Sequence, residues 1–201
     1  MPERLVRTYS VAELERMAQD YVSRHLGSAM PIPIDVDHLV EQAEGLDLDY
    51  YPKLRANHGV LGGVWRDLDS GVLFIFIDQD LADDDRPNSW ARYRMTVAEE
   101  LAHVHLHRGL IEAVASPADF KALHSHAQWF EIERNAKRFA SAILMPSPAL
   151  AREAARVYEE IVGQPTIRPQ LHQADASTHW LEPIQKWLCD ALAKRFEVSN
   201  Q

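Results

Sequence analysis

The sequence contains one cysteine, no long apolar run and no cluster of basic residues. Cys189 is the only cysteine among 201 residues, which rules out an internal disulfide and a cysteine-based zinc cluster. No stretch approaches the roughly 20 apolar residues that cross a bilayer, and the charged N-terminus lacks the apolar core of a signal peptide. We therefore expect a cytoplasmic protein with no membrane partner.

Positive charge is also scarce relative to negative charge. The chain has 21 Lys and Arg against 30 Asp and Glu, a formal net charge of -9. Because a phosphate backbone binds clustered Lys and Arg, we expect no direct nucleic-acid binding. The composition is otherwise that of a globular protein, 46% hydrophobic and 25% charged, and ten histidines are the one unusual count.

The first part of the chain has the signals of two helices. Ser10 and Glu13 form a capping box, and apolar residues recur at helical spacing until Gly27. Asp35 is a plausible N-cap for a shorter helix that ends at Gly45.

Strand-like patterns follow these helices. They occur at residues 46–50, 60–65 and 72–77. A polar turn at 67–71 predicts that the second and third runs pair as a hairpin, and the third, apolar on both faces, is expected to be the central strand. The acidic stretch 78–85 lacks the spacing of a calcium-binding loop, so a solvated loop is predicted there.

The rest of the chain has helical patterns. Helices are predicted at about 90–107, 128–144, 148–162 and 180–196, with a loop at 163–178. The predicted fold class is α+β, mostly helical with a small antiparallel three-stranded sheet. We predict one domain over 1–201, comprising N-terminal helices and sheet (1–89), a central helix pair (90–146) and a C-terminal helical part (147–201).

The helix predicted at 90–107 carries a potential metal site. Glu99 and His103 are separated by four residues, so on a helix both project from one face and reach one ion. Glu100 follows the first of them, as in the H-E-x-x-H pattern in which the glutamate deprotonates a water. The same Glu–His spacing is also typical of a surface ion pair.

Zinc peptidases with the H-E-x-x-H pattern hold the ion with two ligands one helical turn apart and need a third protein ligand. Glu133 is the candidate for this third ligand. The apolar residues of the helix predicted at 128–144 form a stripe, and Glu133 lies at its border, able to point toward the first helix. Three protein ligands leave a fourth position for water.

These two segments resemble the signatures of the ImmA/IrrE metallopeptidases. The segment Met95–His107, MTVAEELAHVHLH, is similar to a family pattern of approximately F-T-x-A-H-E-x-G-H-x-x-x-H. The segment Glu133–Pro146, ERNAKRFASAILMP, resembles approximately E-x-x-A-x-x-F-A-x-x-L-M-P. Both signatures occur in the family order, which makes the resemblance specific.

The resemblance implies a cytoplasmic zinc endopeptidase with gluzincin-like active-site helices, commonly acting on a helix-turn-helix repressor encoded nearby. By position it makes His103 and Glu133 zinc ligands and Glu100 the general base, with Glu99 in the place of the first histidine. His107 matches a recurrent histidine of the first signature and is a possible accessory residue.

Glu99 is the main departure from the family pattern. One imidazole and two carboxylates form a harder, more anionic site, which we expect to bind zinc less tightly and to accept manganese or iron more readily. A catalytically weak or inactive peptidase-like binding module is therefore the alternative. The His103–His107 pair could also bind a metal, but Val104 then stands where a base is needed.

Overall fold

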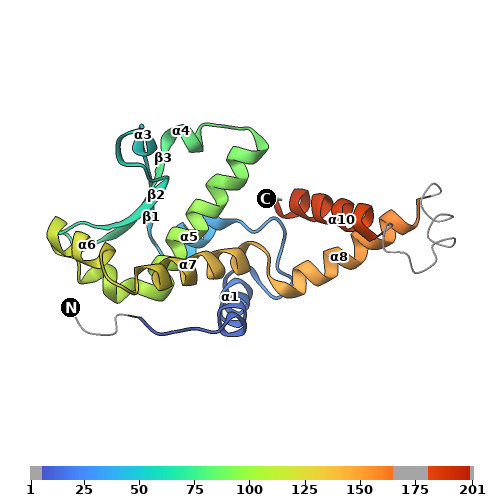
Figure 1. The fold of residues 1–201 in the computed structure, drawn as a ribbon, viewed down its shortest axis with the longest axis horizontal. Helices are drawn as coiled ribbons and strands as arrows, with labels where there is room; N and C mark the ends of the chain where they lie inside the picture. Colours follow the sequence, from blue (N-terminus) through green and yellow to red (C-terminus); the bar gives the residue numbers. More distant parts are fainter. Residues whose placement is uncertain (1–5, 165–180, 200–201) are drawn as a thin grey trace.

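The computed structural model describes residues 6–164 and 181–199 (Figure 1). The loop predicted at 163–178 lies almost entirely outside these residues. None of the helices in the described part combines the length and the apolarity that crossing a bilayer requires.

The N-terminal helices begin where the capping signals predict. Helix α1, Val11–Leu26, has the full capping box: the backbone N–H of Glu13 donates to Ser10 Oγ, and the backbone N–H of Ser10 donates to Glu13 Oε2 at 2.9 Å. Helix α2, Val36–His38, is capped by Asp35 and continues directly into the π-helical turn η1, Leu39–Ala43.

The sheet has three strands in the order β1-β3-β2, with bounds β1 Asp47–Tyr51, β2 Gly62–Arg66 and β3 Leu73–Asp78. Strands β2 and β3 pair antiparallel and β3 is central, as predicted. The prediction of a wholly antiparallel sheet is wrong, because β1 pairs parallel to β3. A single alternating run has the same pattern in either direction, so the sequence did not reveal the direction of pairing.

Three short helices are absent from the sequence prediction. They are α3 Leu54–His58, α4 Gln79–Ala82 and α6 Pro117–His124. Helix α4 lies within the predicted acidic loop, and its N-cap Asp78 is buried. The two carboxylate oxygens of Asp78 accept the backbone N–H groups of Leu81 and Arg55. Asp78 therefore holds the end of β3 to two helices instead of lying in a solvated loop.

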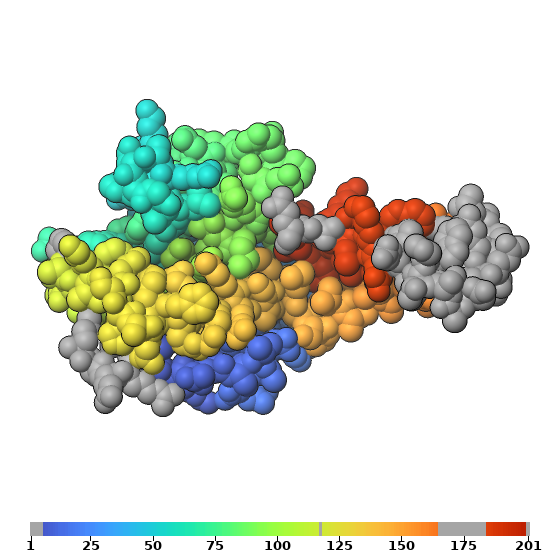
Figure 2. Space-filling view, in the orientation of Figure 1, coloured from blue at the N-terminus to red at the C-terminus, as the bar shows by residue number. Residues whose placement is uncertain are grey.

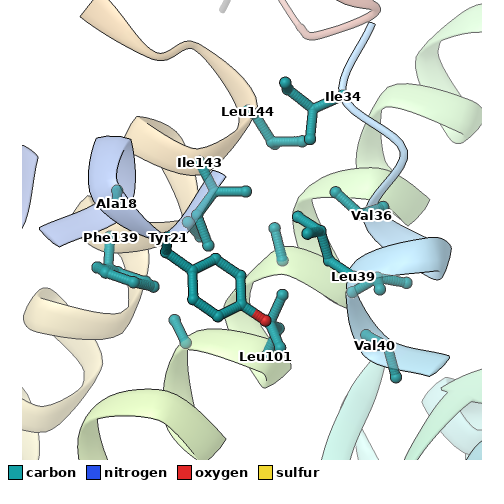
Figure 3. Packing of buried hydrophobic residues seen from close by; sticks show 14 of the residues in the cluster. Ala18, Tyr21, Ile34, Val36, Leu39, Val40, Leu101, Phe139, Ile143 and Leu144 are labelled. Atoms are coloured by element: carbon teal, nitrogen blue, oxygen red, sulfur yellow. The ribbon is translucent and has the colours of Figure 1, made fainter. Parts of the chain in front are cut away.

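The predicted site lies on two long helices, α5 Pro87–Glu112 and α7 Trp129–Leu144, which pack against each other. Helix α1 covers α7, and the sheet packs on α5 (Figure 1). Figure 3 shows the shared core, to which α1, α5, α7 and the α2–η1 segment contribute Ala18, Tyr21, Val36, Leu39, Val40, Leu101, Phe139, Ile143 and Leu144. This core fixes the distance between α5 and α7.

Helices α8 Ser147–Val162 and α10 Leu181–Phe196 pack side by side. They extend from one end of the body formed by the sheet and α1, α5 and α7, as both the ribbon and the space-filling views show (Figures 1 and 2). Val157 and Ile161 pack against α10, and the fully buried Phe196 returns to the main core.

Candidate metal centre

Helix α5 carries four of the five predicted site residues. Its apolar residues, such as Val97 and Leu101, are fully buried in the core. Glu99, Glu100 and His103 lie beside this apolar face and are only partly buried. The one-turn spacing of Glu99 and His103 places both side chains on the side of α5 that approaches α7.

Helix α7 supplies the fifth residue, Glu133. The predicted apolar stripe of this helix is buried, and it includes Ile132, Ala136, Phe139, Ala140, Ile143 and Leu144. The side chain of Glu133, at the border of the stripe, keeps 27% of its surface exposed. Burial of the stripe against α5 therefore brings one carboxylate of α7 to the ionisable side chains of α5.

Glu99, His103 and Glu133 converge on one point. One potential ligand atom from each lies within 4.8 Å of the others. Nε2 of His103 is 3.5 Å from Oε1 of Glu133 across the two helices. The structure thus brings together the three residues for which the sequence predicts metal binding.

His107 lies one turn beyond His103, at a kink in α5. Its backbone has φ -129° and ψ 15°, which is non-helical, and its side chain is buried. The Nδ1 atoms of His107 and His103 are 3.4 Å apart, in a long hydrogen bond that either ring can donate. If His103 donates from Nδ1, its Nε2 lone pair is free to bind a cation, which is the tautomer a metal ligand needs.

Lys137 is a site residue that the sequence analysis did not identify. Its Nζ lies 3.7 Å from Oε1 of Glu99 and 3.9 Å from Oε2 of Glu133. The signal that could have found it is its spacing of four residues from Glu133 on the same helix face. Its approach to Glu99, on another helix, could not be read from the sequence.

The carboxyl groups of the site are more easily protonated than ordinary ones. Burial raises the pKa of Glu99 and of Glu133, and the Lys137 ammonium partly opposes both increases. For Glu100, burial followed by the repulsion of Glu99 and Glu133 raises the pKa to about 8. Burial is the largest cause of each of these shifts, and the Lys137 ammonium does not cancel it at Glu99 or Glu133.

The histidines of the site are neutral at physiological pH. Burial, followed by repulsion from His107, Lys137 and His124, lowers the pKa of His103 to about 3. Burial alone lowers the pKa of His107 to about 4. A neutral imidazole is the form that binds metals.

This donor set fits a divalent cation. Two carboxylates and a neutral imidazole offer oxygen and nitrogen ligands from two helices that pack against each other. Glu99, His103 and Glu133 are the residues that would hold the ion. Glu100, next to them in the sequence and in their electrostatic field, would stay outside the ligand set.

Two other histidines of the region have structural contacts. His105 is exposed and stacks on Phe139, with ring centroids 5.0 Å apart and planes at 13°, and its Nδ1 lies 3.8 Å from Oε1 of Glu44. His124 ends helix α6 and stacks on Trp129, with ring centroids 3.9 Å apart. The described contacts of His105 are thus with residues outside the proposed metal site, while His124 is close enough to influence the pKa of His103.

A known protein family covers this part of the chain. The model of the IrrE N-terminal-like domain, the family Peptidase M78, matches residues 66–201, a range that contains all of α5 and α7. No curated protein matches the chain. The match confirms the resemblance found in the two signatures, and the chain belongs to the Peptidase M78 family of metallopeptidases.

Proposed function

We propose that this protein is a cytoplasmic metal-dependent endopeptidase of the ImmA/IrrE type. The observation that carries the proposal is the convergence of Glu99, His103 and Glu133 beside Glu100, in a chain of a peptidase family. The proposed ligands are Glu99, His103 and Glu133, and the proposed general base is Glu100.

The proposed ion is zinc, with manganese or iron as alternatives. A site with two carboxylates and one imidazole is harder than a site with two imidazoles and one carboxylate. The change improves the binding of manganese and iron relative to that of zinc, which is why they are the alternatives. When bound, the ion supplies Lewis acidity that polarises the scissile carbonyl and makes water more acidic.

Glu100 moves the proton in this proposal. Its carboxylate accepts a proton from the attacking water and passes it to the amine nitrogen as the peptide bond breaks. A general base works best when its pKa is near the operating pH, and the surroundings of Glu100 already raise its pKa toward that range. His107 supports the site by accepting the Nδ1 proton of His103.

The proposed substrate is a helix-turn-helix transcriptional repressor or a similar regulatory protein. This part of the proposal rests on the resemblance to the family. The formal charge of -9 favours a protein partner over nucleic acid. If a repressor gene lies beside the gene for this protein, its product is the first substrate to test.

Glu100→Gln tests the enzyme proposal directly. The purified variant and wild type are incubated with the candidate repressor and zinc or manganese, and fragments are identified by mass spectrometry. We expect the variant to lose cleavage while its metal content stays unchanged. Glu112→Gln, an exposed acidic position on the same helix, is the matched control and should cleave like wild type. Equal cleavage by Glu100→Gln would refute the proposed role of Glu100.

A peptidase-derived binding module is the second candidate. The observation that favours it is the contact of the Lys137 ammonium with both Glu99 and Glu133. A bound metal ion would need these same two carboxylates as ligands. On this proposal the protein binds a regulatory partner without cutting it. Metal analysis of protein purified without chelators separates the two candidates, because a stoichiometric transition metal contradicts an inert site.

A further inference from the structure

Lys137 joins the two carboxylates that belong to different helices. Its ammonium is slightly closer to Glu99 of α5, at 3.7 Å, than to Glu133 of its own helix, at 3.9 Å. An ordinary pair at a spacing of four residues would satisfy only Glu133. The contact with Glu99 therefore indicates a role between the helices.

Lys137 is more exposed to solvent than the two carboxylates that it contacts. The Lys137 side chain is 58% exposed, whereas those of Glu99 and Glu133 are 20% and 27% exposed. The ammonium therefore contacts both carboxylates and remains open to solvent. It can leave them by rotating into water, since its stem is long and flexible.

The charges in the site show what this ammonium does. When ionised, Glu99, Glu100 and Glu133 contribute three formal negative charges, and Lys137 contacts two of these carboxylates. Lys137 offsets one of them and reduces the repulsion between Glu99 and Glu133. A divalent ion bound to the same carboxylates would lie close to this positive charge and be repelled by it.

We propose that Lys137 is an internal counter-cation of the metal centre, which holds Glu99 and Glu133 together in the metal-free protein and competes electrostatically with the divalent ion. The inference rests on the proposed metal site and concerns what sets its affinity. Lys137 thereby makes occupancy of the site depend on a higher concentration of free metal than the ligands alone would need.

Lys137→Met tests this inference, with Arg138→Met as the matched control. Both changes remove one positive charge from an exposed position of α7. Of these two residues, only Lys137 has a described contact with Glu99 and Glu133. Zinc and manganese affinities are measured by competition with a chromophoric chelator. Thermal unfolding is measured separately in excess chelator.

We expect Lys137→Met to bind either ion roughly tenfold more tightly, because a nearby positive charge is gone, and Arg138→Met to change affinity by less than about twofold. In chelator, Lys137→Met should unfold at a lower temperature than Arg138→Met. In a Glu99→Gln background the gain in affinity should shrink, since one of the two joined carboxylates has lost its charge.

Unchanged or weaker metal binding by Lys137→Met would overturn the inference, and weaker binding would make Lys137 a residue that orients the ligands. Equal unfolding temperatures of the two variants in chelator would overturn the counter-cation role. These outcomes differ from failure of the proposed function, in which neither wild type nor any variant binds metal. If the Lys137→Met variant binds metal and the wild type does not, the inference is supported and the absence of metal from the wild type is explained.

Discussion

Two helix pairs of this protein surround their glutamates in opposite ways. In the α8–α10 pair, Glu153 is only 3% exposed and lies under three arginines, with Arg195 of α10 donating to it at 2.7 Å and Arg152 and Arg156 at 3.3 Å. The hydrogen bond from Arg195, helped by the other two arginines, lowers the pKa of Glu153.

In the α5–α7 pair, Glu99 and Glu133 share one ammonium, that of Lys137, and the pKa of both and of the neighbouring Glu100 is raised. A carboxylate that joins helices needs cations around it, and Glu153 has them. Carboxylates whose charge is left uncompensated weaken the fold unless a ligand supplies the missing charge. The contrast therefore favours the α5–α7 pair as the place of the proposed metal site.

The largest effect on metal affinity and stability should come from replacing one glutamate of each helix pair, Glu133 or Glu153, by glutamine. Glu133→Gln should weaken metal binding on the order of 100-fold or more, because it removes a ligand charge, and should stabilise the metal-free protein. Glu153→Gln should destabilise the protein and leave metal affinity unchanged. Metal titration and denaturant unfolding in chelator measure both effects. The same response from both variants would break the comparison.

Restoring the usual family ligand should give the next largest effect. Glu99→His should tighten zinc binding roughly 10- to 100-fold, because it replaces a hard carboxylate by an imidazole and removes a negative charge from a crowded site. Zinc affinity relative to manganese affinity is the measurement, since the preference should move toward zinc. No gain for zinc would mean that Glu99 is not a ligand.

His107 should affect metal binding through His103. His107→Leu should weaken zinc binding about tenfold, because His103 loses the acceptor that fixes its tautomer. His107→Asn keeps an oxygen acceptor near the position of Nδ1 and should restore much of the affinity. If both variants bind zinc equally, the contact between the two rings has no role in binding. Unfolding in chelator reports any purely structural damage.

The smallest effect is a pH dependence of the metal-free protein. Glu100 has a pKa raised to about 8 in the folded chain, so the folded state binds more protons than the unfolded state between the unfolded pKa, about 4.3, and pH 8. Stability should therefore fall as the pH rises from 6.5 to 8, by about 1 kcal/mol. Below about pH 6.5 the lowered pKa values of His103 and His107 act in the opposite direction.

Denaturant unfolding in chelator at several pH values measures this slope. Glu100→Gln should remove much of it, and Glu112→Gln should keep it. Glu153 does not contribute in this pH range. Its pKa is lowered in the folded protein, so its carboxyl group is ionised in both the folded and the unfolded state. A wild-type profile that is flat from pH 6.5 to 8 contradicts the proposed surroundings of Glu100.

Much of the helical structure could be predicted because its signals are local. The Ser10–Glu13 capping box and the apolar stripe of α7 each lie within a few turns, and both appear in the structure as expected. The short helices α3, α4 and α6 escaped prediction, since one or two turns carry too few residues to show a period. Asp78 was misjudged because an acidic stretch gives no sign that one of its members is buried.

The site was predictable in part for the same reason. Glu99, Glu100 and His103 share one helical turn, so their relative placement follows from helix geometry alone. Glu133 could be proposed only because its helix has an amphipathic pattern and its segment resembles a family signature. The role of Lys137 was missed because its partner Glu99 is 38 positions away in the sequence (137 - 99).

By itself, the sequence determined the longer helices, the strand positions and which glutamates and histidines share a helix face, since these depend on spacing along one segment. The tertiary structure decided that β1 runs parallel to β3, that His103 meets Glu133, that α5 kinks at His107 and that Lys137 joins two carboxylates. Strand direction and contacts between helices depend on how distant apolar surfaces pack together, and no local pattern records that packing.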